Sequence, residues 1–199
     1  MNTTLSVMQH ELLDREAIRH CLMRYCRGID RMDEELVLGV YWPEAVDEHL
    51  EFSGSPREFV AWCMPMMREM DQTSHMIGNI LIVIDGHRAD VESYFQAFHR
   101  LRAGDGQDAR DLVVGGRYLD CFERRDDEWR IARRRVIVDW FRHYADSADW
   151  RTGPLGMDIV PGARKPDDPS CRVAGFASGR GGLGPPAPPT GSPGQLAGV

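Results

Sequence analysis

Residues 112–142 constrain the fold of this chain most, because they read as two long strand-like runs joined by a short charged turn. The stretch is LVVGGRYLDCFERRDDEWRIARRRVIVDWFR, with β-branched and aromatic residues throughout both runs. The turn over 124–127 is typical of a hairpin, although it lacks the Asn-Gly or Asp-Gly of the tightest turns. Apolar residues occupy both faces from Val136 onward, so we expect the second strand to be covered on both sides.

Helices precede this hairpin, and further strands lead into it. Apolar residues recur at helical spacing over 9–29, a short helix is predicted over 34–41, and a third helix begins after Ser55 with a capping sequence. From Thr73 the period changes to two, and helix and strand do not alternate along the chain. The sequence therefore predicts an α+β fold with N-terminal helices packed on a curved, mostly antiparallel sheet. The predicted strands are 46–52, 73–84, 89–101, 112–124 and 128–143.

Composition divides the chain into three parts. Residues 1–145 have the size of one ordinary domain. Residues 146–172 are interrupted by Pro and Gly, and we expect them to wrap that domain as a C-terminal extension. The last 27 residues contain eight Gly and five Pro, a composition that cannot bury a core. We therefore expect 173–199 to be a disordered tail.

The net charge of −7 lies in the predicted domain, because residues 146–199 carry five charges of each sign. An acidic domain argues against nucleic acid and anionic membranes as partners. The first residues lack the apolar core of a signal peptide, and the longest aliphatic run, Ile80–Ile84, is too short to span a bilayer. These features favour a cytoplasmic protein. The only lysine is Lys165, which excludes Schiff-base chemistry on a lysine of the domain.

The sequence has no pattern that indicates a cofactor or a metal. Its five cysteines form no CxxC pair and no Cys/His zinc spacing, so we expect reduced thiols. Residues 179–184 match G-x-G-x-x-G formally, but they lie in the Gly/Pro tail without a preceding strand. We expect no cofactor and no metal.

Three residues suited to proton transfer occur where predicted elements end or begin. Tyr25 and Asp30 lie at the end of the first helix, and His75 lies at the start of the first long strand. A carboxylate beside an imidazole fixes the tautomer of the ring and raises its basicity, which makes the histidine a competent general base. Each residue also has a structural interpretation: a core tyrosine, a helix-end aspartate and a hydrogen-bonded strand histidine. Their convergence would indicate a catalytic site.

Several segments resemble a known family. They read LLDREAIRHCLMRYCRGIDRMDEE, YWPEAV, SHMIGN, VESYFQAFHR and GRYLDCFERRDDEWRIARRRVIVDW. In order and spacing, over about residues 9–145, they resemble the SnoaL-like branch of the nuclear transport factor 2-like superfamily. That resemblance implies a cone-shaped α+β barrel. The branch includes lyases of the scytalone dehydratase, bile acid 7α-dehydratase and hexachlorocyclohexane dehydrochlorinase types, as well as isomerases, cyclases and non-catalytic members.

The resemblance also implies roles for particular residues. In several eliminating members, an Asp at the end of the first helix pairs with a His on the first long strand, and Asp30 and His75 match these positions. A tyrosine five residues before the Asp resembles the bile acid dehydratase arrangement, and Tyr25 matches it. These three residues are therefore the expected catalytic residues, together with an arginine that such sites often take from the last strand.

The run from Arg133 to Arg135 leaves the identity of that arginine open. Strict alternation places Arg133 and Arg135 on the face of Ile131 and Arg134 on the other face. Of the arginines on that face we favour Arg135 as the fourth catalytic residue. Asp120 could orient this arginine, and a structural salt bridge is an equal alternative. The residues expected to bind the substrate are Trp42, Met67, Tyr118, Asp120 and His99.

Together these expectations describe a cofactor-independent lyase that acts on an apolar, aromatic or polycyclic small molecule by Asp–His acid–base catalysis. Dehydration is the simplest reaction, and an aldehyde-releasing C–C cleavage uses the same groups. The resemblance further implies aromatic compound catabolism and a homodimer or higher homo-oligomer that pairs through the open sheet face. The alternatives are an isomerase or cyclase, a non-catalytic ligand-binding or dimerisation domain, and the small subunit of a ring-hydroxylating dioxygenase.

Overall fold

The computed structural model describes residues 2–104, 106–146, 148, 152, 156–159 and 162–173, with side chains from residue 7 onward. The Gly/Pro-rich tail predicted over 173–199 lies outside the described residues, apart from Val173. None of the described helices is long and apolar enough to cross a membrane.

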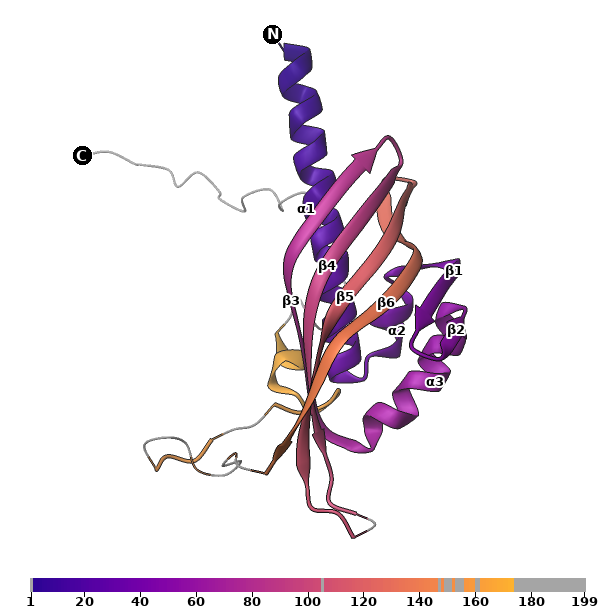
Figure 1. Cartoon of the computed structure of the whole chain (residues 1–199). Helices are drawn as coiled ribbons and strands as arrows, with labels where there is room; N and C mark the ends of the chain where they lie inside the picture. Colours follow the sequence, from indigo (N-terminus) through magenta and orange to yellow (C-terminus); the bar gives the residue numbers. More distant parts are fainter. Residues whose placement is uncertain are drawn as a thin grey trace, which may run out of the picture.

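Helices in the described part of the chain lie mainly in the N-terminal third. The first is much longer than predicted, and its first turns extend beyond the sheet (Figure 1). The third has the predicted capping box, in which Ser55 and Glu58 exchange hydrogen bonds at the helix start. The helices are α1 (Asn2–Arg31), α2 (Glu34–Leu38), α3 (Pro56–Arg68) and the 3-10 helix η1 (Pro169–Arg172).

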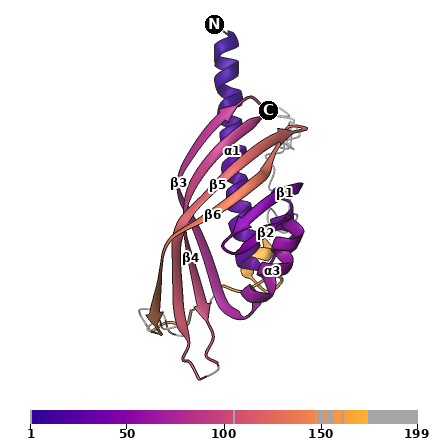
Figure 2. The ribbon, with the colours of Figure 1, turned by 45° about the vertical axis from the view of Figure 1, so that its right-hand side comes forward.

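The sheet is curved, and α1 lies along its hollow side, while α2, α3 and the two shortest strands close one side of the cone (Figures 1 and 2). The strands are β1 (Tyr41–His49), β2 (Phe52–Gly54), β3 (Met70–Asp85), β4 (Arg88–Leu101), β5 (Arg110–Arg125) and β6 (Glu128–Ala145). Their order is β2–β1–β6–β5–β4–β3, and only the β1–β6 pair is parallel. This arrangement confirms the predicted α+β fold with a mostly antiparallel sheet.

The predicted hairpin is present as β5 and β6. Asp126 and Asp127 turn the chain with positive φ angles of 49° and 62°, as the two central residues of a type I′ turn do. Aspartate tolerates this backbone conformation better than most non-glycine residues. The hairpin therefore forms without the glycine that marks the commonest turns of this type.

Three predictions about local structure are wrong. The second helix ends at Leu38 rather than at 41, and β1 begins at Tyr41 rather than at 46. Pro43 lies where the β1–β6 pairing is irregular, so the strand does not need the backbone N–H that proline lacks. The last strand is not covered on both sides within one chain, because Trp140 is 42% and Phe141 64% exposed.

The core fills the space between α1 and the sheet. One stripe of α1 (Ile18, Leu22, Tyr25 and Ile29) is at most 1% exposed, as its helical spacing predicts. Residues on the hollow side of β3, β4, β5 and β6 alternate with exposed ones and pack against that stripe. The last turn of α1 thereby comes to lie beside the first residues of β3, which places Asp30 and His75 in reach of each other.

Candidate active site

Asp30 and His75 form a hydrogen-bonded pair between α1 and β3. Asp30 Oδ1 lies 2.7 Å from the ring Nδ1 of His75, and the backbone amide of His75 donates to Asp30 Oδ2 at 2.8 Å. An ionised carboxylate can only accept hydrogen bonds, so Nδ1 carries the ring proton. In the neutral ring Nε2 is then unprotonated, with a lone pair available to accept a proton.

The Asp30 carboxylate is held in its ionised form. Burial alone would raise its pKa, but hydrogen bonds and charge from His75, with a further hydrogen bond from the Thr73 hydroxyl, lower the pKa below the usual value. The side chains of Asp30 and His75 are only 12% and 8% exposed. This geometry suits a general base with its orienting carboxylate.

A pocket of about 300 Å³ opens beside this pair. Its α1 residues recur at spacings of three and four, so one face of the helix supplies most of its wall. Of these helix residues only Asp30 was predicted from the sequence. Arg27 and Arg31 were missed, although Arg27 precedes Asp30 by three residues and Arg31 follows Arg27 by four, a helical spacing that could have indicated them. Apolar side chains from α1 and β3 complete the wall of the pocket. The lining residues are Met23, Cys26, Arg27, Asp30, Arg31, His75 and Ile77.

His99 lies next to the pair on β4. The rings of His75 and His99 meet edge to face with centroids 5.7 Å apart. Burial, with the charge of His75 as a second cause, lowers the pKa of His99 to about 4, so its ring is neutral at pH 7. Its Nδ1 is buried and has no hydrogen-bond partner among the described residues.

A second polar cluster occupies the centre of the cone. Arg134, which is 0% exposed, donates to both oxygens of Asp120 at 2.8 and 2.7 Å. Its guanidinium lies 4.2 Å from the ring centroids of Tyr25 and Tyr118, within cation–π range. Burial raises the pKa of Tyr25 well above its ordinary value. Tyr25 therefore packs on Arg134 and is not a lining residue of the pocket beside His75.

The structure corrects the assignment of the last-strand arginine. Cys121 pairs with Arg133 whereas Phe122 pairs with Ile131, so Ala132 is an extra residue in β6, a β-bulge that reverses the alternation of faces. Arg134 consequently joins the buried face of Ile131, and the prediction that favoured Arg135 is wrong about which side chain points inward.

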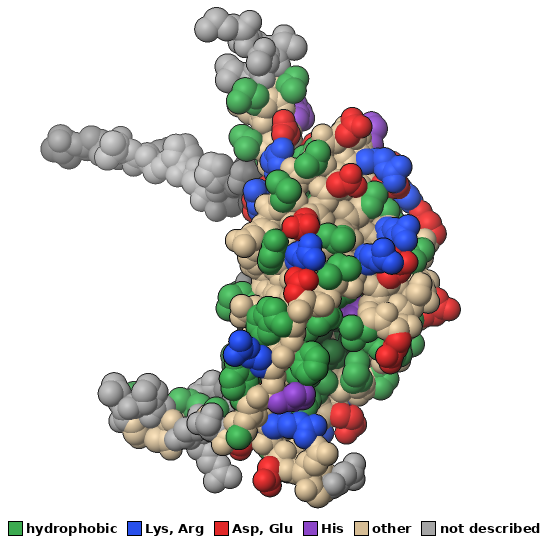
Figure 3. Space-filling view, in the orientation of Figure 1, with side chains coloured by type: hydrophobic (Ala, Val, Ile, Leu, Met, Phe, Trp, Pro, Cys, Tyr) green, Lys and Arg blue, Asp and Glu red, His purple; other side chains and the backbone are tan. Residues whose placement is uncertain are grey.

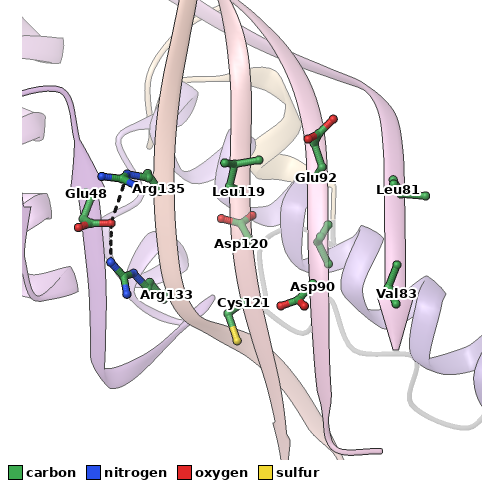
Figure 4. Close-up of a pocket in the computed structure, with 11 residues that line it drawn as sticks. Glu48, Leu81, Val83, Asp90, Glu92, Leu119, Asp120, Cys121, Arg133 and Arg135 are labelled. Atoms are coloured by element: carbon green, nitrogen blue, oxygen red, sulfur yellow. Dashed lines mark hydrogen bonds and ion pairs between the residues drawn. The ribbon is translucent and has the colours of Figure 1, made fainter. Parts of the chain in front are cut away.

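Arg135 lies on the opposite, open face of the sheet. There it reaches Glu48 at 3.7 Å, and Arg133 reaches the same carboxylate at 3.0 Å (Figure 4). These groups border a shallow groove of about 520 Å³ across β3, β4, β5 and β6, with Leu81 and Val83 at its far side. The groove lies on the other face of the sheet from the Asp30–His75 pair.

The expected substrate-binding residues do not all meet. Tyr118 and Asp120 belong to the Arg134 cluster, and His99 contacts His75. Met67 is buried in α3, and its carbonyl accepts a hydrogen bond from Arg164 at 3.5 Å.

Trp42 lies elsewhere, since its Nε1 donates to the Glu123 carbonyl at 3.0 Å. His75 is level with Val114 on β5, because both pair with Ala97 of β4. Glu123 follows Val114 by nine residues on the same strand, about 30 Å at the usual rise of a strand. Trp42 is therefore not a wall of the dyad pocket.

Comparisons with known proteins place the chain in a family. The family model described as a SnoaL-like domain matches residues 10–135, well over half of the chain. A search of curated proteins found no match.

Solved structures share the fold at low sequence identity. A protein from Kribbella flavida is 22% identical with a TM-score of 0.59, covering 65% of this chain and 93% of its own. The type 2 hexachlorocyclohexane dehydrochlorinase LinA is 17% identical with a TM-score of 0.61, covering 76% and 95%. A protein from Novosphingobium aromaticivorans, proposed to be a scytalone dehydratase, is 20% identical with a TM-score of 0.61, covering 77% and 98%. At these identities the likeness establishes the fold alone.

Proposed function

The chain belongs to the SnoaL-like domain family, and from that premise we propose that it is a cofactor-independent lyase whose general base is His75, oriented by Asp30. The observation that carries this proposal is the 2.7 Å contact between Asp30 Oδ1 and His75 Nδ1 beside a pocket. Similarity of the fold to a dehydrochlorinase and to a protein proposed to be a dehydratase supports an elimination reaction.

In the proposed reaction, Nε2 of His75 takes a proton from a carbon atom of the substrate. The electrons of that C–H bond form a double bond, while the leaving group departs from the neighbouring carbon with its bonding electrons. In a dehydration, the departing hydroxide takes the proton back from His75 and forms water. Asp30 stabilises the transient imidazolium, as the carboxylate of a catalytic triad does.

The pocket suits a small, mostly apolar substrate with one polar centre. Met23, Cys26 and Ile77 supply apolar walls, and the guanidinium groups of Arg27 and Arg31 supply the cations that can stabilise a departing oxygen or halide. We assign no such part to Arg135, whose side chain lies on the other face of the sheet. An aromatic or alicyclic substrate, and hence a role in aromatic compound catabolism, fits these walls.

A filled cone favours a second candidate function, a ligand-binding or assembly domain without catalysis. Arg134, Tyr25, Tyr41 and Tyr118 occupy the cone centre and are each at most 1% exposed. Because these side chains fill the centre of the cone, a substrate would bind in the pocket between α1 and β3 instead. The experiment below separates the two candidates, because only a lyase forms product in a manner that depends on His75.

The test is turnover without added cofactor. The purified protein with EDTA would be incubated with scytalone, hexachlorocyclohexane and a set of aromatic β-hydroxy ketones, and alkene products would be measured by chromatography. His75→Gln and Asp30→Asn should each lower kcat by about 100-fold or more, because both remove the oriented base. His143→Gln is the matched control, since His143 is an exposed strand histidine. Elimination at the wild-type rate in His75→Gln would overturn the proposal.

We further propose that the chain forms a homodimer through the open face of the sheet. Hydrophobic side chains lie among charges of both signs over the surface seen in Figure 3, and the exposed apolar side chains are the groups that a second copy could cover. Exposed hydrophobic residues at outward-facing positions of β3, β4 and β6 include Met76, Leu81, Val83, Tyr94 and Trp140.

A further inference from the structure

The end of α1 depends on a segment that is far away in sequence. The last carbonyls of an α-helix have no partner within the helix. The carbonyls of Gly28 and Ile29 accept hydrogen bonds from the backbone amides of Asp33 and Met32, at 2.9 and 3.3 Å. The carbonyl of Asp30 accepts from Arg164 Nη1 at 2.6 Å, and that of Arg31 accepts from the Lys165 amide at 2.9 Å. The C-terminal segment over 162–173 therefore caps the helix that carries Asp30.

Arg164 contacts three elements around the Asp30–His75 pair. Besides the Asp30 carbonyl on α1, its Nη1 donates to Thr73 Oγ1 on β3 at 2.7 Å, and its Nη2 donates to the Met67 carbonyl on α3 at 3.5 Å. The guanidinium group is planar and presents several donors in a fixed arrangement. A single side chain thus holds the ends of α1, β3 and α3 together.

Thr73 connects Arg164 to the carboxylate itself. Its hydroxyl accepts from Arg164 at 2.7 Å, and hydrogen bonding from this hydroxyl is one of the causes that lower the pKa of Asp30. Because the guanidinium donates to the hydroxyl oxygen, the hydroxyl proton remains available to donate to the Asp30 carboxylate. Thr73 is 4% exposed, so water has little access to compete for this proton.

We propose that Arg164 is a positioning residue for the Asp30–His75 pair, an inference that rests on the proposed function of that pair. By holding the Asp30 carbonyl and the Thr73 hydroxyl together, Arg164 aligns the carboxylate with His75 Nδ1. Arg164 is not itself among the residues that line the pocket, so it acts through Asp30 and Thr73. The C-terminal segment is in this way part of the site, although it comes after the strands and helices of the cone.

The tautomer of His75 tests the proposal without a substrate. In protein labelled with ¹⁵N-histidine, the chemical shifts of Nδ1 and Nε2 show which nitrogen carries the proton, and His75→Gln assigns the signals. An unconstrained imidazole favours the proton on Nε2, whereas a carboxylate at Nδ1 favours it there. We expect the Nδ1–H form in the wild type, a shift toward the Nε2–H form in Arg164→Gln and in Thr73→Val, and a spectrum closer to wild type in Arg164→Lys.

Lys165→Ala is the matched control, because Lys165 belongs to the same segment but its side chain reaches Asp33 at 3.0 Å instead of the pair. Spectra of Arg164→Gln and Lys165→Ala that coincide would overturn the role of Arg164. If Arg164→Gln does not fold, Thr73→Val decides the question: a Thr73→Val spectrum that coincides with that of Lys165→Ala would overturn the proposed alignment of the carboxylate. A wild-type ring without the Nδ1–H form would instead contradict the Asp30–His75 pair, and with it the proposed function. Once a substrate is known, Arg164→Gln should lower kcat about 10-fold or more with little change in KM.

Discussion

At the scale of single residues, Arg134 and Asp120 are a buried ion pair whose members depend on each other. Both side chains are 0% exposed, so either charge left alone would lie unpaired in the core. Asp120→Asn should lower the free energy of unfolding by about 3 kcal/mol, because Arg134 loses its counter-charge. The measurement is urea denaturation followed by circular dichroism.

The matched control for this prediction is Glu92→Gln on the neighbouring strand. Glu92 pairs with Arg117 at 3.6 Å, and both side chains are about a third exposed, so the expected loss is below about 0.5 kcal/mol. Replacing the buried pair together, with Asp120→Leu and Arg134→Met, should cost less than Asp120→Asn alone. An Asp120→Asn variant as stable as the control would contradict the interpretation of a mutually dependent pair.

His99 should make the fold sensitive to acid. Its pKa falls from 6.5 to about 4 on folding, so the unfolded chain binds the proton more readily between these values. Above about pH 6.5, His99 therefore does not lower the free energy of unfolding. As the pH falls toward 4, its protonation in the unfolded chain lowers this free energy by on the order of 3 kcal/mol. His99→Gln should lose less stability than the wild type between pH 7 and 4 in denaturation experiments. Equal losses in both proteins would exclude His99 as the titrating group.

At the scale of secondary-structure elements, the segment over 162–173 is attached to α1 by a network around Asp168. The Ser170 hydroxyl, the backbone amides of Ala163 and Ser170, and Arg31 at 3.3 Å hold this carboxylate, and they lower its pKa to about 2. A carboxylate with a depressed pKa stabilises the fold above its unfolded value near 4, and this contribution is lost as the pH falls toward 2.

We therefore expect Asp168→Asn to loosen the segment already at pH 7. Hydrogen exchange of the amides over 162–173 should become faster in this variant, while the amides of β4 and β5 keep the wild-type rate. Asp167→Asn is the matched control, because Asp167 is the exposed neighbouring aspartate. Equal protection of the segment in both variants would show that Asp168 does not anchor it.

At the scale of the whole molecule, the open sheet face predicts association of two copies. Trp140 packs on Gly115, where a Cβ atom would lie 2.3 Å from the indole ring, yet the tryptophan remains 42% exposed. Trp140→Asp combined with Met76→Asp should convert a dimer to a monomer, because each places a charge in an apolar interface. Light scattering coupled to size-exclusion chromatography measures the mass. The control is Leu50→Asp, which should leave the dimer unchanged because Leu50 lies in the turn between β1 and β2.

Much of the fold was predictable because its signals are local. The apolar stripe of α1, the capping box before α3 and the alternation in β4 and β5 each depend on residues close together in the chain. The hairpin turn followed from the two strand-like runs that flank it. The candidate base and its carboxylate came from matching Asp30 and His75 to positions known in the family. The structure then placed the two side chains within hydrogen-bonding distance.

Other features were decided only when distant segments packed together. The bulge at Ala132 follows from how β5 and β6 pair, and the inserted residue moves the side chains after it to the opposite face, as far as a second irregularity at Asp139. Arg134 therefore faces the core in place of Arg135. The contact of Arg164 with Asp30 joins residues 134 positions apart, which no local period can indicate. The sequence by itself determined most of the helices and strands, because their signals are local, and its resemblance to the family named Asp30 and His75 as candidates. The tertiary structure determined that these two side chains meet and which arginines lie near them, because pairing register and long-range contacts are properties of the packed chain.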